Sequence, residues 1–419
     1  MLPRRRKRIY TFLILLLIIF LYHKSFDTMD FINRRAELPT WGNNVSRKIS
    51  DYLDPDKETA LIVPKGFCQD KAILIIAVAS KLKNFKQRSL IRQTWGNTND
   101  FNYPAFVKFH GYSVENFLQP LPEHMNLFKD YLQGRGEQMR LNVRLVFVVG
   151  RSRDKSSTIY MKREAELHND IIQEDFVDCY QNLTLKSVMI LKHIANNCTK
   201  NSAFFLKCDD DSFVNIPNLL HYILGGTIPL YKDTLEYYDR TSYKPTDRLN
   251  RTKNLIMGHR FCNVLPSRDV SDKSYMPSSM YPLDIYPDYI SGSGYLISMD
   301  VVPTLYTTAL DTNFLPLEDV FITGICADIA GIERLHHPLF SPFTPEGLCS
   351  LKGSILSHRV EHWEMAWDVL VSDYNIKCQT LAPHTINWTL NGAKDKCNFD
   401  LFSQKFYYFM KYLKLGIGI

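Results

Sequence analysis

The hydrophobic positions of the chain form short, unbroken runs among stretches with a helical pattern. The runs cover residues 72–79, 143–149 and 203–207. Unbroken apolar runs of this length are typical of parallel strands that are covered on both faces. Residues 162–173 and 185–196 have the spacing of helices. Strands that alternate with helices predict an α/β domain with a mostly parallel central sheet.

A longer apolar stretch near the N-terminus, residues 9–22, follows five cations within residues 1–8. As a helix it would span about 21 Å, against a hydrocarbon core of roughly 27–30 Å. A cleaved signal peptide has the same two segments, but residues 23–27 offer no small-x-small cleavage site. The sequence therefore predicts a single transmembrane signal anchor over residues 9–24. Its basic tail, residues 1–8, is cytosolic by the positive-inside rule, which makes this a type II protein.

The segment after the anchor, residues 25–67, is polar and mixed in charge and contains several prolines. Such a composition is typical of an extended linker, and here it predicts a lumenal stem. Continuous hydrophobic patterning begins near Cys68, so we expect the folded domain to occupy residues 68–419.

Composition and charge narrow the class of protein. The 419 residues are 45% hydrophobic and 22% charged, with 19 Gly and 20 Pro, which excludes collagen-like, coiled-coil and largely disordered chains. The net charge of +6 falls to +1 once the five N-terminal cations are set aside. A nearly neutral body without a basic stripe is not that of a nucleic-acid-binding protein.

Cysteines and glycosylation sequons both fit a lumenal body. Nine cysteines suit a compartment that permits disulfides, although an odd number leaves at least one thiol unpaired or paired between chains. Asn-x-Ser/Thr sequons, which predict N-glycosylation, occur at Asn44, Asn182, Asn197, Asn250 and Asn387. Each signal alone is weak, because sequons arise by chance in a chain of this length.

Three consecutive acids, Asp209, Asp210 and Asp211, follow the apolar run 203–207. They would lie at the carboxyl end of a strand, where ligands of open α/β sheets bind. Adjacent anions need a compensating cation, and their hard oxygens suit Mg²⁺ or Mn²⁺, which in turn can hold a diphosphate. The alternative is a solvated acidic turn.

A second acidic pair, Glu318 and Asp319, precedes an apolar helical pattern and offers a candidate general base. First-turn residues favoured by the helix dipole are the alternative explanation. Gly292 and Gly294 lie in an aromatic turn that runs into a strand. Glycines at this spacing permit close approach of the backbone to a ligand, although a tight turn alone would explain them.

In this order, these segments resemble the beta-1,3-glycosyltransferase family of the Golgi, over most of the chain from about residue 68 to about residue 370. That family comprises beta-1,3-galactosyltransferases and beta-1,3-N-acetylglucosaminyltransferases, with Fringe as a more distant relative. The matching stretches are residues 88–96, 164–170, 175–186, 207–215, 286–295 and 318–320. The resemblance implies a GT-A-type fold, a UDP-sugar donor, a divalent metal, usually Mn²⁺, and inversion at the anomeric carbon.

The resemblance also implies roles for individual residues. Asp209 and Asp211 match metal-binding acids, with Asp211 as a direct ligand, and Asp209 and Asp210 belong to the donor-binding motif. His358 matches a late family histidine that can supply a further metal ligand, although His362 is near enough to confuse the assignment.

On the acceptor side, Asp319 matches the general base and Glu318 its neighbour at the acceptor site. Arg88 and Arg92 match residues that line the donor side, although two cations on one helix could equally form a solvated face. The turn with Gly292 matches a loop beside the donor and acceptor sugars, and Gly294 belongs to the same loop.

The chain departs from the family at three places. Residues 95–143 form a longer connection than is typical, which predicts an insertion, and residues 371–419 form a C-terminal extension without a clear counterpart. Cys208 stands where a small polar or aliphatic residue is common.

Together these features predict a metal-dependent, inverting beta-1,3-glycosyltransferase, anchored in the Golgi membrane with its catalytic domain in the lumen. It would transfer galactose from UDP-galactose to the 3-hydroxyl of a glycan acceptor on a glycoprotein or glycolipid. Transfer of N-acetylglucosamine or N-acetylgalactosamine is the alternative, because the shared motifs bind UDP and metal rather than the C2 substituent of the sugar. A rival of another class is an inactive glycan-binding or chaperone-like member. The sequence leaves a homodimer open.

Overall fold

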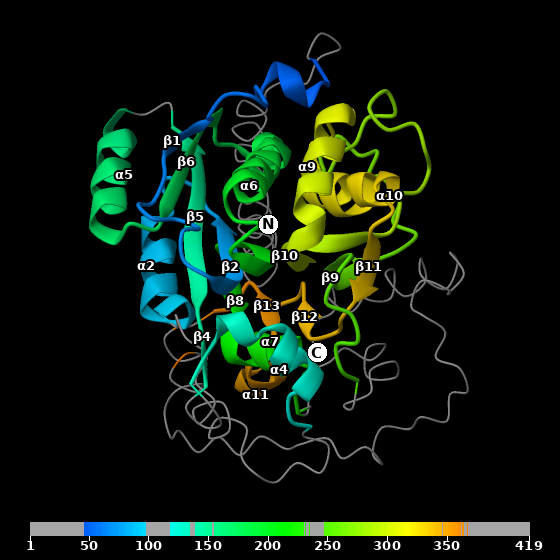
Figure 1. The fold of residues 1–419 in the computed structure, drawn as a ribbon. Coiled ribbons are helices and arrows are strands. Elements are labelled where there is room, and N and C mark those ends of the chain that lie inside the picture. Colours follow the sequence, from blue (N-terminus) through cyan, green and yellow to red (C-terminus); the bar gives the residue numbers. More distant parts are fainter. Residues whose placement is uncertain are drawn as a thin grey trace, which may run out of the picture. The chain divides into compact units, whose positions relative to one another are not determined.

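The computed structural model describes residues 46–97, 118–134, 139–152, 155–229, 231, 234, 247–345, 347–361, 363 and 367. Among these residues, Ser46 and residues 267–282 belong to a small compact unit, and the others belong to a large one. The large unit carries the sheets and all the predicted donor-site, metal-site and catalytic residues (Figure 1).

Eight described strands of the large unit form its main sheet, in the order β1-β6-β5-β2-β7-β10-β9-β11. In sheet order their bounds are Ala60–Ile62, Ile171–Val177, Val143–Arg151, Ala72–Ala79, Ser202–Asp209, Tyr289–Ser298, Leu255–Phe261 and Glu333–His336. Strands β6, β5, β2 and β7 are mutually parallel, whereas β10 is antiparallel to both of its neighbours. The sheet is therefore mixed: β1 and β10 run antiparallel to their neighbours, whereas β11 is parallel to β9, so the predicted parallel arrangement holds for the central strands but not for the whole sheet.

The unbroken apolar runs became the central strands β2, β5 and β7, as predicted. All eight residues of β2 are buried. The helix predicted over residues 162–173 instead ends at His168, because Asn169 adopts a left-handed conformation with φ of 52° and the chain then enters β6. The strand expected after the aromatic turn is β10, but it begins at Tyr289, so Gly292 and Gly294 lie within the strand rather than in a turn before it.

Helices cover the sheet and its edges. Their bounds are α2 Phe85–Gln93, α4 Pro122–Leu127, α5 Lys155–His168, α6 Leu183–Asn197, α7 Ile216–Ile223, α9 Val302–Asp311, α10 Ala327–Ile329 and α11 Leu348–Gly353, with a π-helix at Val320–Cys326. Short 3₁₀ turns lie at Ile49–Asp51, Trp95–Asn97, Lys129–Tyr131, Tyr180–Asn182 and Met299–Val301. Helix α6 packs on β2, β5 and β6 and against α9 (Figure 1).

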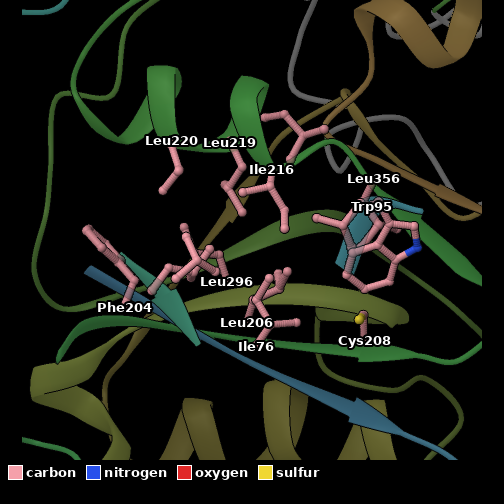
Figure 2. Packing of buried hydrophobic residues seen from close by; sticks show 14 of the residues in the cluster. Ile76, Trp95, Phe204, Leu206, Cys208, Ile216, Leu219, Leu220, Leu296 and Leu356 are labelled. Carbon is pink, nitrogen blue, oxygen red and sulfur yellow. The ribbon is translucent and has the colours of Figure 1, made fainter. Parts of the chain in front are cut away.

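The main core fills the space between α7 and one face of the sheet (Figure 2). Side chains two residues apart on β7, such as Leu206 and Cys208, point to this face, as the strand period requires. Leu219 of α7 packs onto them, and the buried Trp95 is part of the same cluster. The residues between, including Lys207, therefore point to the other face of the sheet.

A small sheet of three strands brings distant segments to the end of β7. It has the order β12-β13-β8, with bounds Phe340–Ser341, Leu356–His358 and Ser212–Val214. Strand β8 begins directly after the acidic triplet, and β13 runs antiparallel to it with His358 opposite Ser212. Strands β3 (Leu132–Gln133) and β4 (Arg140–Leu141) form a further pair inside the predicted insertion over residues 95–143.

The predicted tail, the anchor over residues 9–24, residues 25–45 of the stem and the extension over residues 371–419 lie outside the described residues. In the part of the chain that the structure describes, no helix combines the length and apolarity needed to cross a membrane. Strand β1 lies inside the predicted stem, yet it pairs with β6 at the edge of the main sheet. Folded structure therefore starts before Cys68.

The expectation of disulfides is confirmed. Cys68, just before β2, is bonded to Cys198 at the end of α6, with their Cα atoms 4.9 Å apart. Cys262 and Cys349 are also disulfide-bonded. The first bond ties the start of the central strand to the helix that covers it.

Gly294 provides a test of the packing between β7, β10 and β13. A Cβ atom there would overlap Leu356 Cδ1 and lie 3.1 Å from Cys208 Cβ. We expect Gly294→Ala to lower the free energy of unfolding by about 1–3 kcal/mol, as overpacking of a core typically does. Gly347 is the control, because a Cβ there would meet nothing within 4 Å. Denaturant titrations in which both variants matched the wild type would contradict the packing described here.

Candidate active site

The three carboxylates of the acidic triplet have different partners. Asp209 ends β7 and accepts a hydrogen bond from Lys207 Nζ at 2.8 Å. Asp210 accepts from Ser80 Oγ at 2.7 Å and from Asn84 Nδ2 at 2.8 Å, both in the loop after β2. Burial raises the pKa of Asp210. This middle carboxylate therefore joins two strand ends, while its neighbours are turned elsewhere.

The partner of Asp211 is His358, which β13 brings beside the triplet. His358 Nε2 lies 3.1 Å from Asp211 Oδ1, and Nδ1 lies 3.1 Å from the carbonyl oxygen of Pro342. A neutral imidazole that donates from Nδ1 would turn the lone pair of Nε2 toward the carboxylate, which is repulsive unless a proton or a cation lies between them. Burial acts to lower the pKa of His358, but Asp211 outweighs it and raises that pKa.

The donor atoms of Asp209, Asp211 and His358 fit a divalent cation. One ligand atom from each residue lies within 4.8 Å of the other two. The side chains of Asp209 and Asp211 are 36% and 51% exposed, so the cluster is open to solvent and to a ligand. Carboxylate oxygens with one imidazole nitrogen suit Mn²⁺ and Mg²⁺. The structure thus brings together the three metal ligands predicted from the sequence, whereas His362 lies outside the described residues.

A buried lysine, which the sequence analysis did not single out, joins the metal cluster to the second acidic pair. Lys207 is 5% exposed, and its Nζ lies 2.8 Å from Asp209 Oδ1, 3.2 Å from Glu318 Oε2 and 2.8 Å from the carbonyl oxygen of Gly292. Burial acts to lower the pKa of Lys207, but the two carboxylates outweigh it and raise that pKa, so the ammonium is charged. The signal in the sequence was a lysine inside an otherwise apolar strand, which requires an anionic partner.

Both oxygens of Glu318 are engaged by the protein. The side chain is 6% exposed, its Oε2 faces Lys207, and its Oε1 accepts a 2.5 Å hydrogen bond from the hydroxyl of Tyr295. A carboxylate held in this way has a fixed orientation.

Asp319 has a different environment, although it is adjacent in sequence. It caps the π-helix, where Oδ1 accepts from the Val320 N–H at 2.9 Å and Oδ2 accepts from the Gly292 N–H at 3.1 Å. Burial and the neighbouring charge of Glu318 raise the pKa of Asp319 to about 6. A carboxylate with a pKa in this range suits a general base at near-neutral pH.

Gly292 allows the backbone of β10 to approach both acids. A Cβ atom there would lie 3.3 Å from Asp319 Cβ and 3.3 Å from Glu318 Oε2. The π-helix is tied to the same strand by Thr323, whose Oγ1 accepts from the Ile290 N–H at 2.8 Å. The predicted close approach of this glycine is therefore toward the candidate base, and its contact with a ligand stays a prediction.

Arg88 is fully buried, so the alternative explanation, that it belongs to a solvated helix face, is wrong for this residue. Its guanidinium pairs with both oxygens of Glu164, donates to Ser80 Oγ at 3.1 Å and reaches two backbone carbonyls of the loop after β2. Because Ser80 Oγ also donates to Asp210, Arg88 supports the segment that holds the triplet. Its predicted contact with the donor stays a prediction.

Arg92, one turn further along α2, is also engaged by protein groups. Its Nε and one terminal nitrogen bind Asp170 at 2.7 and 2.8 Å, and the other binds Glu164 at 2.8 Å. The guanidinium lies 4.8 Å from the centroid of the Phe147 ring. The arginines therefore join α2 to α5 and the start of β6, and the predicted donor-side role of Arg92 is likewise untested.

The described sequons differ in accessibility. Asn197 and Asn250 are exposed. Asn182 is half-buried, its Nδ2 donates to the Val177 carbonyl at 2.9 Å, and the buried Thr184 of the same sequon donates to the Leu315 carbonyl. Asn44 and Asn387 lie outside the described residues. Glycosylation stays a prediction at all five positions.

Comparisons with known proteins identify the family to which the chain belongs. Residues 131–338 match the family model described as Galactosyltransferase. Human beta-1,3-galactosyltransferase 1 is 29% identical over 343 residues, which cover 81% of this chain and 85% of that protein. Lactosylceramide 1,3-N-acetyl-beta-D-glucosaminyltransferase A of Danio rerio is 30% identical over 306 residues, covering 71% and 66%. Human N-acetyllactosaminide beta-1,3-N-acetylglucosaminyltransferase 4 is 28% identical over 326 residues, covering 76% and 70%. The chain belongs to the galactosyltransferase family, which confirms the resemblance of its motifs.

The metal cluster can be tested without a substrate. We expect Asp211→Asn to weaken Mn²⁺ binding by at least about tenfold, because ligand charge sets the affinity of such sites. Asp210→Asn is the matched control: its carboxylate is held by Ser80 and Asn84, so Mn²⁺ affinity should stay within about threefold of the wild type. Calorimetric titration with Mn²⁺ measures both. Equal losses in the two variants would mean that the triplet acts only as a patch of negative charge.

Proposed function

We propose that this protein is an inverting beta-1,3-glycosyltransferase that transfers galactose from UDP-galactose to the 3-hydroxyl of a glycan on a glycoprotein or glycolipid. One observation carries the proposal. The carboxyl group of Asp319, whose pKa is raised to about 6, is linked through Gly292 and Lys207 to the solvent-accessible cluster of Asp209, Asp211 and His358. Lys207 contacts Asp209 of that cluster and the glycine that binds Asp319. A base for the acceptor and a site for the donor diphosphate are the two requirements of this reaction.

On the donor side, Asp209, Asp211 and His358 would hold the divalent cation. When bound, the cation supplies positive charge that neutralises the departing diphosphate. His358 is oriented for this role by the Pro342 carbonyl, which engages Nδ1 and leaves Nε2 directed at the cluster.

On the acceptor side, Asp319 takes the proton from the 3-hydroxyl while the oxygen of that hydroxyl attacks the anomeric carbon. A bond forms between that oxygen and the anomeric carbon, the bond from this carbon to the UDP oxygen breaks, and the proton ends on a carboxylate oxygen of Asp319. A single displacement of this kind inverts the configuration. Glu318, held by Tyr295 and Lys207, orients the acceptor rather than moving the proton.

The nature of the transferred sugar rests on the relatives. The names of two of them specify N-acetylglucosaminyl transfer, which supports UDP-N-acetylglucosamine as the second candidate donor. UDP-N-acetylgalactosamine remains part of that alternative. A glycan-binding protein without activity is less well supported, because both the candidate metal-ligand cluster and a carboxylate with a raised pKa are present.

The cellular setting is part of the same proposal. The basic segment followed by the apolar run 9–22 supports a type II anchor in the Golgi membrane, with the catalytic domain in the lumen. The disulfide between Cys68 and Cys198 fits an oxidising compartment.

A panel of donors tests the proposed function. The full chain, in detergent with Mn²⁺, is incubated with UDP-galactose, UDP-N-acetylglucosamine or UDP-N-acetylgalactosamine and a set of glycan acceptors, and released UDP and the linkage of the product are measured. We expect UDP-galactose to be the preferred donor and the new linkage to be beta-1,3. Preference for an N-acetylated donor would contradict the assignment of UDP-galactose. Glycan binding without turnover of any donor would support the inactive alternative.

The adjacent acids should differ sharply when each is made neutral. Asp319→Asn should keep Mn²⁺ and UDP affinity but lower kcat by roughly 10²–10⁴-fold, because the proton moves only in the transition state. With the pKa of Asp319 raised to about 6, wild-type kcat should fall on acidification below pH 6, as the base becomes protonated. The residual rate of the variant should lack this pH dependence.

Glu318→Gln is the matched comparison, since it removes the neighbouring charge while keeping the shape of the side chain. It should raise the acceptor KM more than it lowers kcat. If Glu318→Gln were inactive while Asp319→Asn kept near-normal turnover, Glu318 would be the base and the assignment would be reversed.

A further inference from the structure

The ammonium of Lys207 is the point where the two halves of the site meet. It donates to Asp209 on the metal side, to Glu318 on the acceptor side and to the carbonyl oxygen of Gly292 between them. An ammonium has three N–H donors, and these three acceptors use all of them. Its position therefore depends on both acidic clusters, and both clusters depend on it.

The position of Lys207 on β7 fixes the direction of its side chain. Its neighbours on β7, Leu206 and Cys208, face the core under α7, so the strand period turns Lys207 to the opposite face. There it is paired across strands with Tyr295 of β10, and Nζ lies 5.7 Å from the centroid of the tyrosine ring. The same tyrosine hydroxyl binds Glu318, so the ammonium, the ring and the carboxylate form one buried unit.

The backbone of Gly292 links Lys207 to the candidate base, Asp319. Its carbonyl oxygen accepts from Lys207, and its own N–H donates to Asp319 Oδ2 at 3.1 Å. Loss of the ammonium would leave that carbonyl without this donor and would free the strand segment that orients Asp319. On the other side, Asp209 Oδ1 would lose the contact that sets the direction of its carboxylate.

We propose that Lys207 is a positioning residue that aligns the metal-side carboxylate of Asp209 with the Gly292–Asp319 base, so that one side chain governs both cation binding and turnover. The effect of Lys207 on turnover rests on the proposed function, whereas its effect on cation binding does not. The simpler possibility is that Lys207 only neutralises the buried Glu318. In that case its loss would lower stability and leave the folded fraction of the protein with normal cation affinity and kcat.

Lys207→Met tests the proposal, because it removes the charge while keeping an unbranched side chain. Full-chain protein is titrated with Mn²⁺ alone and then with UDP in the presence of Mn²⁺, both by calorimetry, and kcat and acceptor KM are measured per folded molecule. We expect Mn²⁺ affinity to fall about tenfold and kcat about 10²-fold, the range that loss of a group orienting metal ligands or reactants produces. Wild-type values for both quantities would overturn the proposal.

Lys192→Met is the matched control. Lys192 is also a buried ammonium of the large unit, but it donates to the carbonyl oxygens of Asp54 and Lys57, in the segment before β1. Its loss should lower the melting temperature while leaving Mn²⁺ affinity and kcat within about twofold per folded molecule. If the control lost cation affinity and turnover as much as Lys207→Met, the effect would be one of general destabilisation, and the proposal would fail.

Lys207→Arg keeps the charge and covers the case in which the methionine variant does not fold. A planar guanidinium can pair with Asp209 and Glu318, but it cannot donate to Gly292 from the same point. We expect near-normal Mn²⁺ affinity and a kcat reduced by about tenfold. Unchanged kcat would show that charge alone suffices and would overturn the positioning role.

These measurements separate the proposal from the proposed function. A wild-type protein that transfers no sugar would refute the function, while the Mn²⁺ titrations would still decide whether Lys207 orients Asp209. An active wild type whose cation affinity and kcat do not depend on Lys207 would refute only the positioning role.

Discussion

The site depends on the compensation of buried charge around one ammonium. Glu318 lies almost wholly out of water and Asp209 is only partly exposed, and carboxylates in such places are costly unless they are paired and hydrogen-bonded. Lys207 supplies the charge to both, and the hydroxyl of Tyr295 satisfies the remaining oxygen of Glu318. Burial and the neighbouring charge of Glu318 raise the pKa of Asp319, so the contacts that fix one acid also affect the basicity of the next.

The change of strand direction at β7 makes this arrangement possible. Strand β7 carries the acidic triplet at its carboxyl end, and the parallel strand β2 ends at the loop whose Ser80 and Asn84 bind Asp210. Antiparallel β10 runs alongside β7 and brings Gly292 and Tyr295 to Lys207. The small sheet then adds His358 from β13, far along the chain, opposite the residue that follows the triplet. The candidate metal ligands and the acids at 318–319 thus come from different parts of the sequence and are brought together near the end of β7.

Support for the triplet comes from a second group of buried charges. Arg88 binds Glu164 of α5 and Ser80 of the loop after β2, and Ser80 in turn binds Asp210. Residues that the motif match placed on the donor side therefore act, in this structure, through the backbone and side chains that hold the acidic turn. Matched motifs show which residues matter together, but they do not show whether each touches a ligand.

Much of the framework could be predicted from the sequence, because it depends on local patterns. Unbroken apolar runs identified β2, β5 and β7, and the acids at 209–211 and 318–319 were recognisable from their places after a strand and before a helix. The antiparallel direction of β10, the partners of Lys207 and the inward direction of Arg88 were decided only by the tertiary structure. These features are contacts between residues far apart in the chain, such as Lys207 with Gly292 and with Glu318, and hydrophobic periodicity carries no information about which distant strand a side chain will face.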